Sequence, residues 1–431
     1  MYGYERKMLN NDIERIICNF INLKEEEIEK IDCCFNDFYV YLSSIRYECC
    51  PVCGSLKVYS KGFYERNITI PNSVLGSYSV HLKVRRYLCI DCHSSFSDTK
   101  ELCPVNKKIS YATIVNVMEM LKSPRCTFCD AAKANGISSS SVVRIFDEHC
   151  HIERDSFPEV LCMDEVYTRN NDFDAKYSCI FYDFLKQSLI DVTPSRKKDY
   201  LYFYLSNIPK QERDNVRYVC IDMYQPYKQV IEIYFKKAVI CVDSFHVIKT
   251  LNEDLKKVRI RIMKKYDHDS IEYYLLKHFN YLLMDRSINL DNEPRYNKKL
   301  DRYINLNGLL ELILSIDEDL KAAYYLKEKY ILFNRDFSYE EASEKYEEIL
   351  NEFISSNIKE FKDFITALKN WKKEILNSFI RYKGRRINNG VAEGINATIS
   401  LLLFNTRGIR NNCRRRKRIL YAVNKSGFKL K

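Results

Sequence analysis

Three acidic residues, far apart in the chain, occupy positions where carboxylates could act together. Asp164 ends an apolar run that starts at Val160, Asp222 ends a second run that starts at Arg217, and Glu393 lies far downstream. An aspartate in such a place usually caps a turn, but carboxylates are also the hard ligands that Mg²⁺ and Mn²⁺ prefer. Two such ions about 3.5–4 Å apart activate a nucleophile and stabilise the leaving oxygen of a phosphodiester. We therefore predict that the acids converge, with Asp164 bridging two ions and Asp222 and Glu393 each completing one site.

A second acidic position competes with this assignment. Asp243 also ends an apolar run, and His246 follows three residues later. Asp243 could replace Asp222 as the second metal ligand, or the pair could lie beside the triad and orient DNA or the scissile phosphate. We favour the neighbouring pair, because the end of the fourth strand fits Asp222. A helix-capping aspartate with a packed histidine is the third interpretation.

Four cysteines form two CxxC pairs, Cys50 with Cys53 and Cys89 with Cys92, separated by strand-like sequence. Four thiolates on two tight turns can close a tetrahedron around Zn²⁺, and Gly54 lets the backbone turn beneath the metal. Core cysteines without metal are the alternative. We predict a zinc ribbon that stabilises a small domain.

The elements that must position the acids form an α/β pattern. Apolar runs predict strands at 159–164, 177–183, 187–192, 217–222 and 238–243, with helices at 198–208 and 227–235. Three consecutive strands followed by alternating helix and strand is the order of a ribonuclease-H-like sheet. In that fold the first strand carries a carboxylate in its middle and the fourth carries another at its end, side by side in space.

The remaining stretches are simpler. Residues 11–22 predict a helix, and 31–43 alternate like one strand. From 246 to 379 the pattern is almost entirely helical, and one helix is opened by a capping box from Ser338 to Glu341. This long stretch reads as a helical insertion before the helix that carries Glu393.

A helix-turn-helix pattern lies between the zinc ribbon and the first strand of the sheet. Helical sequence from Thr127 is broken at Gly136, and Ser138 stands where it can cap a second helix. In that geometry the start of the second helix faces the major groove of DNA. Packing without DNA contact is the alternative. The predicted DNA-contacting residues of this motif are Ser138, Ser139, Ser141 and Arg144.

The formal net charge of +11 favours a polyanionic partner, most often nucleic acid. Basic residues cluster after the third predicted strand and in the tail 405–431, which has ten Lys and Arg and no acid. We predict phosphate contacts at Arg196, Lys197, Lys198, Arg407, Arg410, Arg414, Arg415, Arg416, Lys417 and Arg418.

Cysteine use and the absence of targeting signals bear on the compartment. The chain has 17 cysteines, an odd number in a large protein, and several lie within apolar strand-like runs: Cys162, Cys179, Cys220 and Cys241. They are expected to be buried, reduced thiols. No apolar core followed by a cleavage site opens the sequence, and no uncharged run approaches 18 residues. A soluble, intracellular protein is expected.

Several blocks, in order, resemble one known group: bacterial insertion-sequence transposases of the ISL-three type. The matching blocks are CPVCG…CIDC, LCMDEV, VRYVCIDMYQPY, VDSFHVIKTLNEDLKKVRIR and NNGVAEGIN. The resemblance implies cut-and-join chemistry at terminal inverted repeats, catalysed by a ribonuclease-H-like domain with Mg²⁺ or Mn²⁺. The family's carboxylates fall on Asp164, Asp222 and Glu393, and its D-x-x-H pair falls on Asp243 and His246.

The expected fold class is α/β plus α: a ribonuclease-H-like mixed sheet with a large helical insertion, preceded by a zinc ribbon and a helix-turn-helix. The expected divisions are 1–104 with the ribbon, 105–155 with the helix-turn-helix, 156–250 and 380–420 as the catalytic domain, 251–379 as the insertion and 405–431 as the basic tail. We expect a cytoplasmic, nucleoid-associated DDE transposase that binds double-stranded DNA and acts as a dimer or larger assembly. A non-catalytic DNA-binding regulator and a nuclease that cleaves without joining are the rivals.

Overall fold

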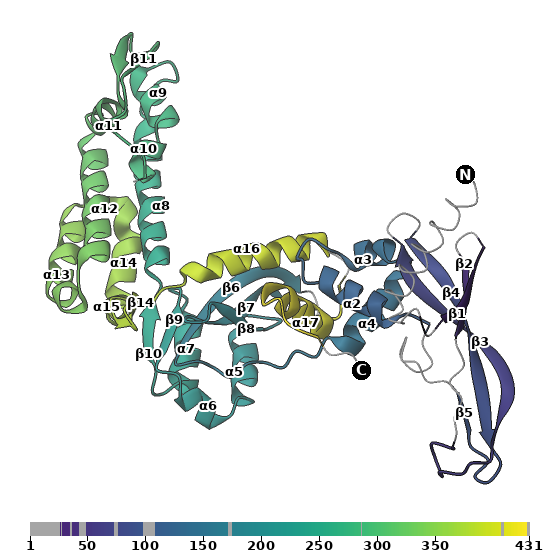
Figure 1. The fold of residues 1–431 in the computed structure, drawn as a ribbon. Helices are drawn as coiled ribbons and strands as arrows, with labels where there is room; N and C mark the ends of the chain where they lie inside the picture. The colour runs from purple at the N-terminus through teal and green to yellow at the C-terminus, as the bar shows by residue number, and fades with distance from the viewer. Residues whose placement is uncertain are drawn as a thin grey trace. The chain divides into compact units, whose positions relative to one another are not determined.

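The computed structural model describes residues 26, 28–34, 37–42, 49–72, 76–97, 108–170, 175–285, 287–406 and 409–428. Mixed sheets and many helices make up the protein (Figure 1). The chain divides into two compact units, Met1–Arg154 with Ala397–Lys431, and Asp155–Asn396. The helix predicted at 11–22 and the predicted phosphate contact Arg407 lie outside the described residues.

The sheet of the first unit is built around one long hairpin. Its strands are β1 (Ile28–Cys34), β2 (Asp37–Leu42), β3 (Val58–Asn72), β4 (Gly76–Cys89) and β5 (Ser95–Ser97). They are ordered β1-β2-β4-β3, with β5 also paired to β4. Val80, Leu82 and Val84 alternate along β4 and are buried, as expected for a strand with one face on a core. The single strand predicted at 31–43 is wrong, because β1 and β2 form an antiparallel pair there.

Helices complete the first unit: α2 (Tyr111–Met120), α3 (Phe128–Ala134), α4 (Ser139–His149) and α17 (Asn412–Val423). Thr127 and Asp130 form a capping box at the start of α3, and Ser138 accepts the Ser141 N–H at the start of α4. Gly136, between the helices, has a φ of +60°, which glycine adopts without strain. The predicted positions of the turn and of the Ser138 cap are confirmed. Tyr421 of α17 packs in the same core as Phe146 of α4.

The second unit contains the sheet predicted from the apolar runs. Its strands are β6 (Val160–Asn170), β7 (Ala175–Asp183), β8 (Ser188–Val192), β9 (Tyr218–Ile221) and β10 (Val239–Val242). Their order is β10-β9-β6-β7-β8; β6, β7 and β8 are antiparallel, whereas β9 and β10 run parallel to β6. The helices between them are α5 (Lys198–Ser206), α6 (Lys210–Asp214) and α7 (Gln225–Tyr234). The five strands and two of these helices confirm the prediction; the short α6 was not predicted.

A helical arm follows β10 (Figure 1). It consists of α8 (Ser244–Met263), α9 (Ile271–His278), α10 (Tyr281–Met284), α11 (Leu306–Leu314), α12 (Glu318–Asp336), α13 (Tyr339–Ser355), α14 (Lys362–Asn370) and α15 (Lys372–Asn377). The capping box of α13 is confirmed, with the Ser338 N–H donating to Glu341 and the Glu341 N–H donating to Ser338. The arm is not purely helical, because β11 (Arg295–Asn297) and β12 (Arg302–Ile304) form a hairpin within it.

The chain returns from the arm through a second small hairpin, β13 (Arg381–Tyr382) with β14 (Arg385–Arg386), and enters α16 (Gly390–Asn405). Glu393 lies in the first turn of α16.

The buried cysteines expected at 162, 179, 220 and 241 are confirmed as buried and free. Among the described helices, none combines the length and apolar character needed to cross a membrane.

Candidate functional site

Three aspartates lie at the same level of three adjacent parallel strands. In the strand pairing, Cys162 of β6 is opposite Cys220 of β9, which is opposite Cys241 of β10. Two residues after each cysteine comes an aspartate, Asp164, Asp222 or Asp243. The Asp243 N–H donates to Ile221 O at 2.8 Å, so this alignment continues beyond the ends of β9 and β10. The sheet therefore brings together three carboxyl-bearing positions that are distant in sequence.

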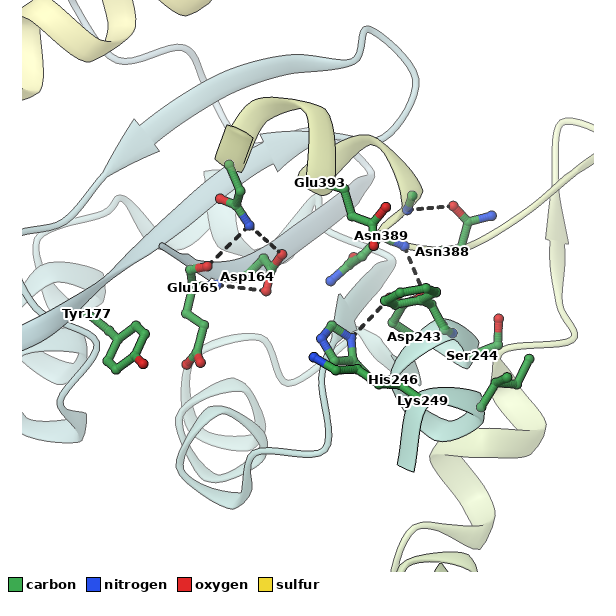
Figure 2. Close-up of a pocket in the computed structure, with 14 residues that line it drawn as sticks. Asp164, Glu165, Tyr177, Asp243, Ser244, His246, Lys249, Asn388, Asn389 and Glu393 are labelled. Atoms are coloured by element: carbon green, nitrogen blue, oxygen red, sulfur yellow. Dashed lines mark hydrogen bonds and ion pairs between the residues drawn. The ribbon is translucent and has the colours of Figure 1, made fainter. Parts of the chain in front are cut away.

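A pocket opens above this part of the sheet, and α16 forms one of its walls (Figure 2). Asp164, Asp243 and His246 line it from the sheet and from α8, and Glu393 lines it from α16. Asp222 is not among the lining residues, although its charge raises the pKa of Asp164. Among the described residues, only the four cysteines considered below bring three or more ligand atoms within 4.8 Å of one another. Asp164, Asp243 and Glu393 thus share a pocket, with Asp222 close enough to act on Asp164, and the acids do not form a closed ligand shell.

Amide side chains tie α16 to the strands that carry the aspartates. Asn396 Nδ2 donates to Asp164 Oδ2 at 3.0 Å and to the carbonyl of Glu165 at 3.2 Å. Asn389, buried just before the helix, donates from its side chain to the carbonyl of Met163 at 3.1 Å. Asn396 lies one helical turn after Glu393, on the same face. These bonds fix the start of α16, and with it Glu393, above β6; the prediction did not include either asparagine among the site residues.

Asp243 is 2% exposed, and both of its carboxylate oxygens have partners. Oδ1 accepts the N–H of Phe245, which caps α8, and the N–H of Asn389, each at 3.3 Å. Oδ2 forms a hydrogen bond with His246 Nδ1 at 3.2 Å. Asp222 differs, because its Oδ1 is buried and has no hydrogen-bond partner. Asp243 is therefore a cap that also holds a pocket-lining histidine, whereas Asp222 has an oxygen available for another ligand.

The acids and His246 perturb one another electrostatically. Burial raises the pKa of Asp164 to about 7, and the charges of Asp222 and Asp243 add to this rise while His246 opposes it. Burial also raises the pKa of Asp222. The hydrogen bond to Asp243 raises the pKa of His246 above its ordinary value. Crowded carboxylates with raised pKa values form a site that a cation would stabilise.

The three basic residues that follow β8 and are expected to contact phosphate differ in their interactions. Arg196 forms an ion pair with Glu165, and its guanidinium lies over the rings of Tyr177 at 4.6 Å and Tyr224 at 4.8 Å. Lys198 Nζ donates to the side chain of Gln229 at 2.7 Å. Lys197 is exposed. Glu165 and Tyr177 themselves line the pocket, so Arg196 is held close to it.

The four predicted zinc ligands come together in the first unit. Sγ of Cys50 lies 3.7 Å from that of Cys92, and Sγ of Cys53 lies 3.6 Å from that of Cys89. A zinc tetrahedron with bonds of about 2.3 Å requires sulfur–sulfur distances of about 3.8 Å, so the cluster has the size of a zinc site. Gly54 has a φ of +72°, as the prediction requires of the turn beneath the metal.

The two cysteine turns share one backbone pattern. The Cys50 N–H donates to Ser55 O at 2.7 Å, and the Cys89 N–H donates to Ser94 O at 3.0 Å. His93, which follows Cys92 as Gly54 follows Cys53, also has a positive φ, of 57°. Both halves of the cluster are therefore shaped alike, although only the first has a glycine.

Some of the residues of the first unit that are predicted to contact DNA are exposed, and others are bonded to neighbouring groups of the protein. Ser138 and Arg144 are exposed on α4, Ser139 and Ser141 are partly exposed, and Arg410 is exposed before α17. Arg414 is paired with Asp147 at 2.5 Å. Arg415 donates to the carbonyl of Ile409, while Arg416 and Lys417 are partly exposed.

The prediction for Arg418 needs correction. Its side chain is fully buried, and its guanidinium donates to the carbonyls of Leu121, Ser123 and Cys126, which follow α2. These bonds supply a charged donor to three carbonyls at the end of α2 and in the turn that follows it. Arg418 therefore joins α17 to α2 and is out of reach of a DNA phosphate.

Comparison with known proteins agrees with this geometry. The model of the ISL3-type DDE transposase family, described as "Transposase", matches residues 161–419. A curated protein from Bordetella parapertussis, "Transposase for insertion sequence element IS1001", is 23% identical over 255 residues. That match covers 59% of this chain and 58% of the relative. Because the family model spans more than half of the sequence and includes Asp164, Asp222, Asp243 and Glu393, the chain belongs to the ISL3 family of insertion-sequence transposases.

Proposed function

We propose that the protein binds the terminal inverted repeats of an insertion sequence and catalyses metal-dependent DNA cleavage and strand transfer. The observation that carries this proposal is the alignment of Asp164, Asp222 and Asp243 on adjacent strands beneath Glu393. We further propose that the second unit has a ribonuclease-H-like fold. The order β10-β9-β6-β7-β8, with three antiparallel strands followed by two parallel ones, supports that assignment.

The carboxylates of Asp164, Asp222 and Glu393 are suitable ligands for a pair of hard divalent cations. All are oxygen donors, Asp164 and Asp222 have raised pKa values, and Asp222 Oδ1 is a buried acceptor without a hydrogen bond. We assign Asp164, Asp222 and Glu393 to hold Mg²⁺ or Mn²⁺, which when bound activates the nucleophile and stabilises the leaving oxygen. Asn396 keeps Asp164 in one orientation.

His246 is assigned to the scissile phosphate. Its hydrogen bond to Asp243 favours the imidazolium, so His246, together with Lys249, brings positive charge to the acids of the pocket. A cation at that place can attract and orient a phosphate that the neighbouring carboxylates would otherwise repel. Asp243 then positions His246, in keeping with the neighbouring-pair interpretation.

The first unit is assigned to DNA recognition. We propose that the cysteine cluster binds structural Zn²⁺, and that α3 and α4 are a helix-turn-helix whose exposed Ser138 and Arg144 meet DNA. Lys197 and the exposed Arg410 would contact phosphates. The two ends of the insertion sequence must be processed together, so we expect a dimer or larger assembly on DNA. Because its substrate is DNA, we propose that the protein acts in the cytoplasm, in association with the nucleoid.

The test uses purified protein, Mg²⁺ and a labelled duplex carrying the inverted repeat that flanks its own reading frame. Wild type should cut at the repeat end and join it to target DNA. Asp164→Asn, Asp222→Asn and Glu393→Gln should bind the duplex without cutting it, whereas Asp199→Asn, at an exposed position on α5, should behave as wild type. Loss of cutting with Asp243→Asn but not with Asp222→Asn would transfer the second ligand to Asp243.

The same assay separates the rival functions. A regulator would bind the repeat and make no cut under any metal condition. A nuclease would cut without producing joined product, even with 3′-hydroxyl ends and target DNA supplied. Either pattern would refute the transposase proposal, because cleavage and joining are both required of it.

A further inference from the structure

The hairpin of β11 and β12 presents two tyrosines to solvent. Tyr296 and Tyr303 are directly opposite each other in the strand pairing, with ring centroids 5.3 Å apart. They are 50% and 73% exposed, respectively. Side chains alternate across a strand, so Asn297 and Ile304 occupy the other face; Ile304 packs against the core of the second unit. The tyrosine pair therefore forms the outer face of the hairpin.

Four basic side chains of the hairpin are exposed: Lys298 and Lys299 in the turn, and Arg295 and Arg302 on the strands, where they alternate with the tyrosines and belong to the other face. Among the described residues none of the four has an ion-pair partner, whereas some other cations of the arm are paired. Arg261 of α8, for example, bonds to Asp319 and Glu360, and Lys265, which follows α8, bonds to Asp317. Acidic residues slightly outnumber basic ones between 251 and 379. The hairpin is thus a basic patch in an otherwise balanced arm.

The hairpin is anchored to the arm. Asn297 Oδ1 accepts the N–H groups of Lys299 and Leu300 at 3.0 and 3.2 Å, which shapes the turn. The same oxygen accepts the hydroxyl of Tyr274 from α9 at 3.4 Å. Asp301, with a φ of 51°, accepts the hydroxyl of Tyr296. The backbone of the hairpin, held in this way, loses little conformational freedom when the hairpin binds.

We propose that this hairpin binds the phosphate backbone of duplex DNA beside the cleavage position. Arg, Lys and Tyr side chains commonly donate hydrogen bonds to phosphate oxygens. When Lys and Arg side chains neutralise phosphates, counterions condensed on the DNA are released, and this favours binding. The inference rests on the proposed function, because it takes the DNA at the pocket as given, and it adds a second contact surface on the arm.

The length of α8 sets the distance between the pocket and the β11–β12 hairpin. α8 starts at the pocket, where Asp243 caps it, and the hairpin lies near its far end (Figure 1). Its 20 residues span about 30 Å at 1.5 Å per residue. Duplex DNA rises about 3.4 Å per base pair, so the hairpin meets the duplex about nine base pairs from the cut.

The test compares two variants that each lose four positive charges. The hairpin variant carries Arg295→Gln, Lys298→Gln, Lys299→Gln and Arg302→Gln. The control variant neutralises four exposed lysines on helices of the same arm: Lys321→Gln, Lys362→Gln, Lys369→Gln and Lys373→Gln. Because changes in the strands could disturb the fold, Lys298→Gln with Lys299→Gln, confined to the turn, is a third variant, and thermal unfolding checks all three.

DNA affinity is measured on the terminal-repeat duplex as a function of salt. The slope of log affinity against log salt should become shallower by about two to four for the hairpin variant, at about 0.9 per lost phosphate contact. The turn variant should lose about half as much, and the control little. Trimming the duplex to fewer than about nine base pairs, on each side of the cut in turn, should abolish the difference between wild type and hairpin variant on one side.

Other outcomes overturn the inference in recognisable ways. Equal slopes for wild type and hairpin variant, or equal losses in hairpin and control variants, would show that the hairpin does not contact DNA. A changed oligomeric state with unchanged DNA affinity would assign the patch to a protein partner. In each case wild-type cutting of the repeat would leave the proposed function standing, whereas absence of binding and cutting by wild type would defeat the function itself.

Discussion

Replacing Asp164 with asparagine should stabilise the magnesium-free protein at pH 8 while abolishing cleavage. Asp164 is 6% exposed, and its pKa is raised from an ordinary value of 3.8 to about 7, first by burial and then by the charges of Asp222 and Asp243. At pH 8 the folded protein therefore holds a buried carboxylate that would be better solvated in the unfolded chain. Asparagine has nearly the same shape and no charge, so this cost disappears.

The magnitude follows from the pKa. A rise from 3.8 to about 7 corresponds to about 4 kcal/mol of lost stability at 1.36 kcal/mol per unit. Two corrections reduce the gain. Asp164 accepts both the Glu165 N–H and the Asn396 amide, and an asparagine must give up one of these bonds, at about 1 kcal/mol. The charge of Asp164 also helps to raise the pKa of His246. Removing that charge takes a favourable partner away from the His246 imidazolium, which reduces the gain in stability further.

The sign with pH is fixed by the direction of the shift. A carboxyl whose pKa is higher in the folded protein contributes its stability below the unfolded pKa and loses it as pH rises through the folded value. Most of this loss accumulates between about pH 4 and pH 7, so the gap between Asp164→Asn and wild type should be below about 1 kcal/mol at pH 5, once the lost hydrogen bond is subtracted, and should reach its full size, at most about 3 kcal/mol, above pH 7. His246, whose pKa is also raised, adds a pH dependence of the same sign to both proteins, so the difference between them is the informative quantity.

The assay is thermal unfolding from pH 5 to 8.5, without Mg²⁺ or Mn²⁺, on protein purified in the presence of Zn²⁺. A gain of 3 kcal/mol corresponds to about 6–12 °C in Tm for a unit of this size. Mg²⁺ should raise the Tm of wild type at pH 8 and narrow the gap, since it stabilises the carboxylate only where one is present. Asp199→Asn should match wild type throughout. If Asp164→Asn melts at or below wild type at every pH, Asp164 does not carry a buried charge and the reasoning fails.

Three further outcomes are expected. Cys89→Ser should lower the zinc content, measured by atomic emission, from about one ion per chain to none, because three thiolates leave the tetrahedron open. Arg418→Ala should destabilise the first unit by about 3 kcal/mol or more in chemical unfolding, since three carbonyls lose a charged donor; Lys417→Ala, on the partly exposed side of α17, should cost little. Affinity for the terminal repeat should fall as pH rises through the raised pKa of His246, and His246→Gln should make that dependence shallower, leaving the part that comes from Asp164.

The α/β sheet was predictable because its strands are short apolar runs between polar turns. The runs that end at Asp164, Asp222 and Asp243 each bury a strand on both faces, and such runs stand out in the sequence. The cysteine cluster was predictable for a different reason, since its ligand spacing and Gly54 are fixed by coordination geometry.

The small hairpins were not predictable in the same way. β11 and β12 have three residues each, mostly polar and exposed, and show no apolar period. Arg418 was grouped with its basic neighbours because a run of like charges conceals the face of the helix that each residue occupies. Only the contacts of α17 with the carbonyls after α2 reveal its different place.

The sequence did contain one signal for the acidic row that its interpretation missed. Cysteine, one residue, then aspartate recurs at 162–164, 220–222 and 241–243. Treated separately, Asp222 and Asp243 look like rivals for one role, but parallel strands in register place both beside Asp164. Their surroundings then distinguish them. The oxygens of Asp243 are engaged by the start of α8, by Asn389 and by His246, while Asp222 keeps a buried oxygen free of hydrogen bonds. We therefore propose different roles for the two carboxylates: Asp222 is available to a cation, and Asp243 holds the histidine that we assign to the phosphate.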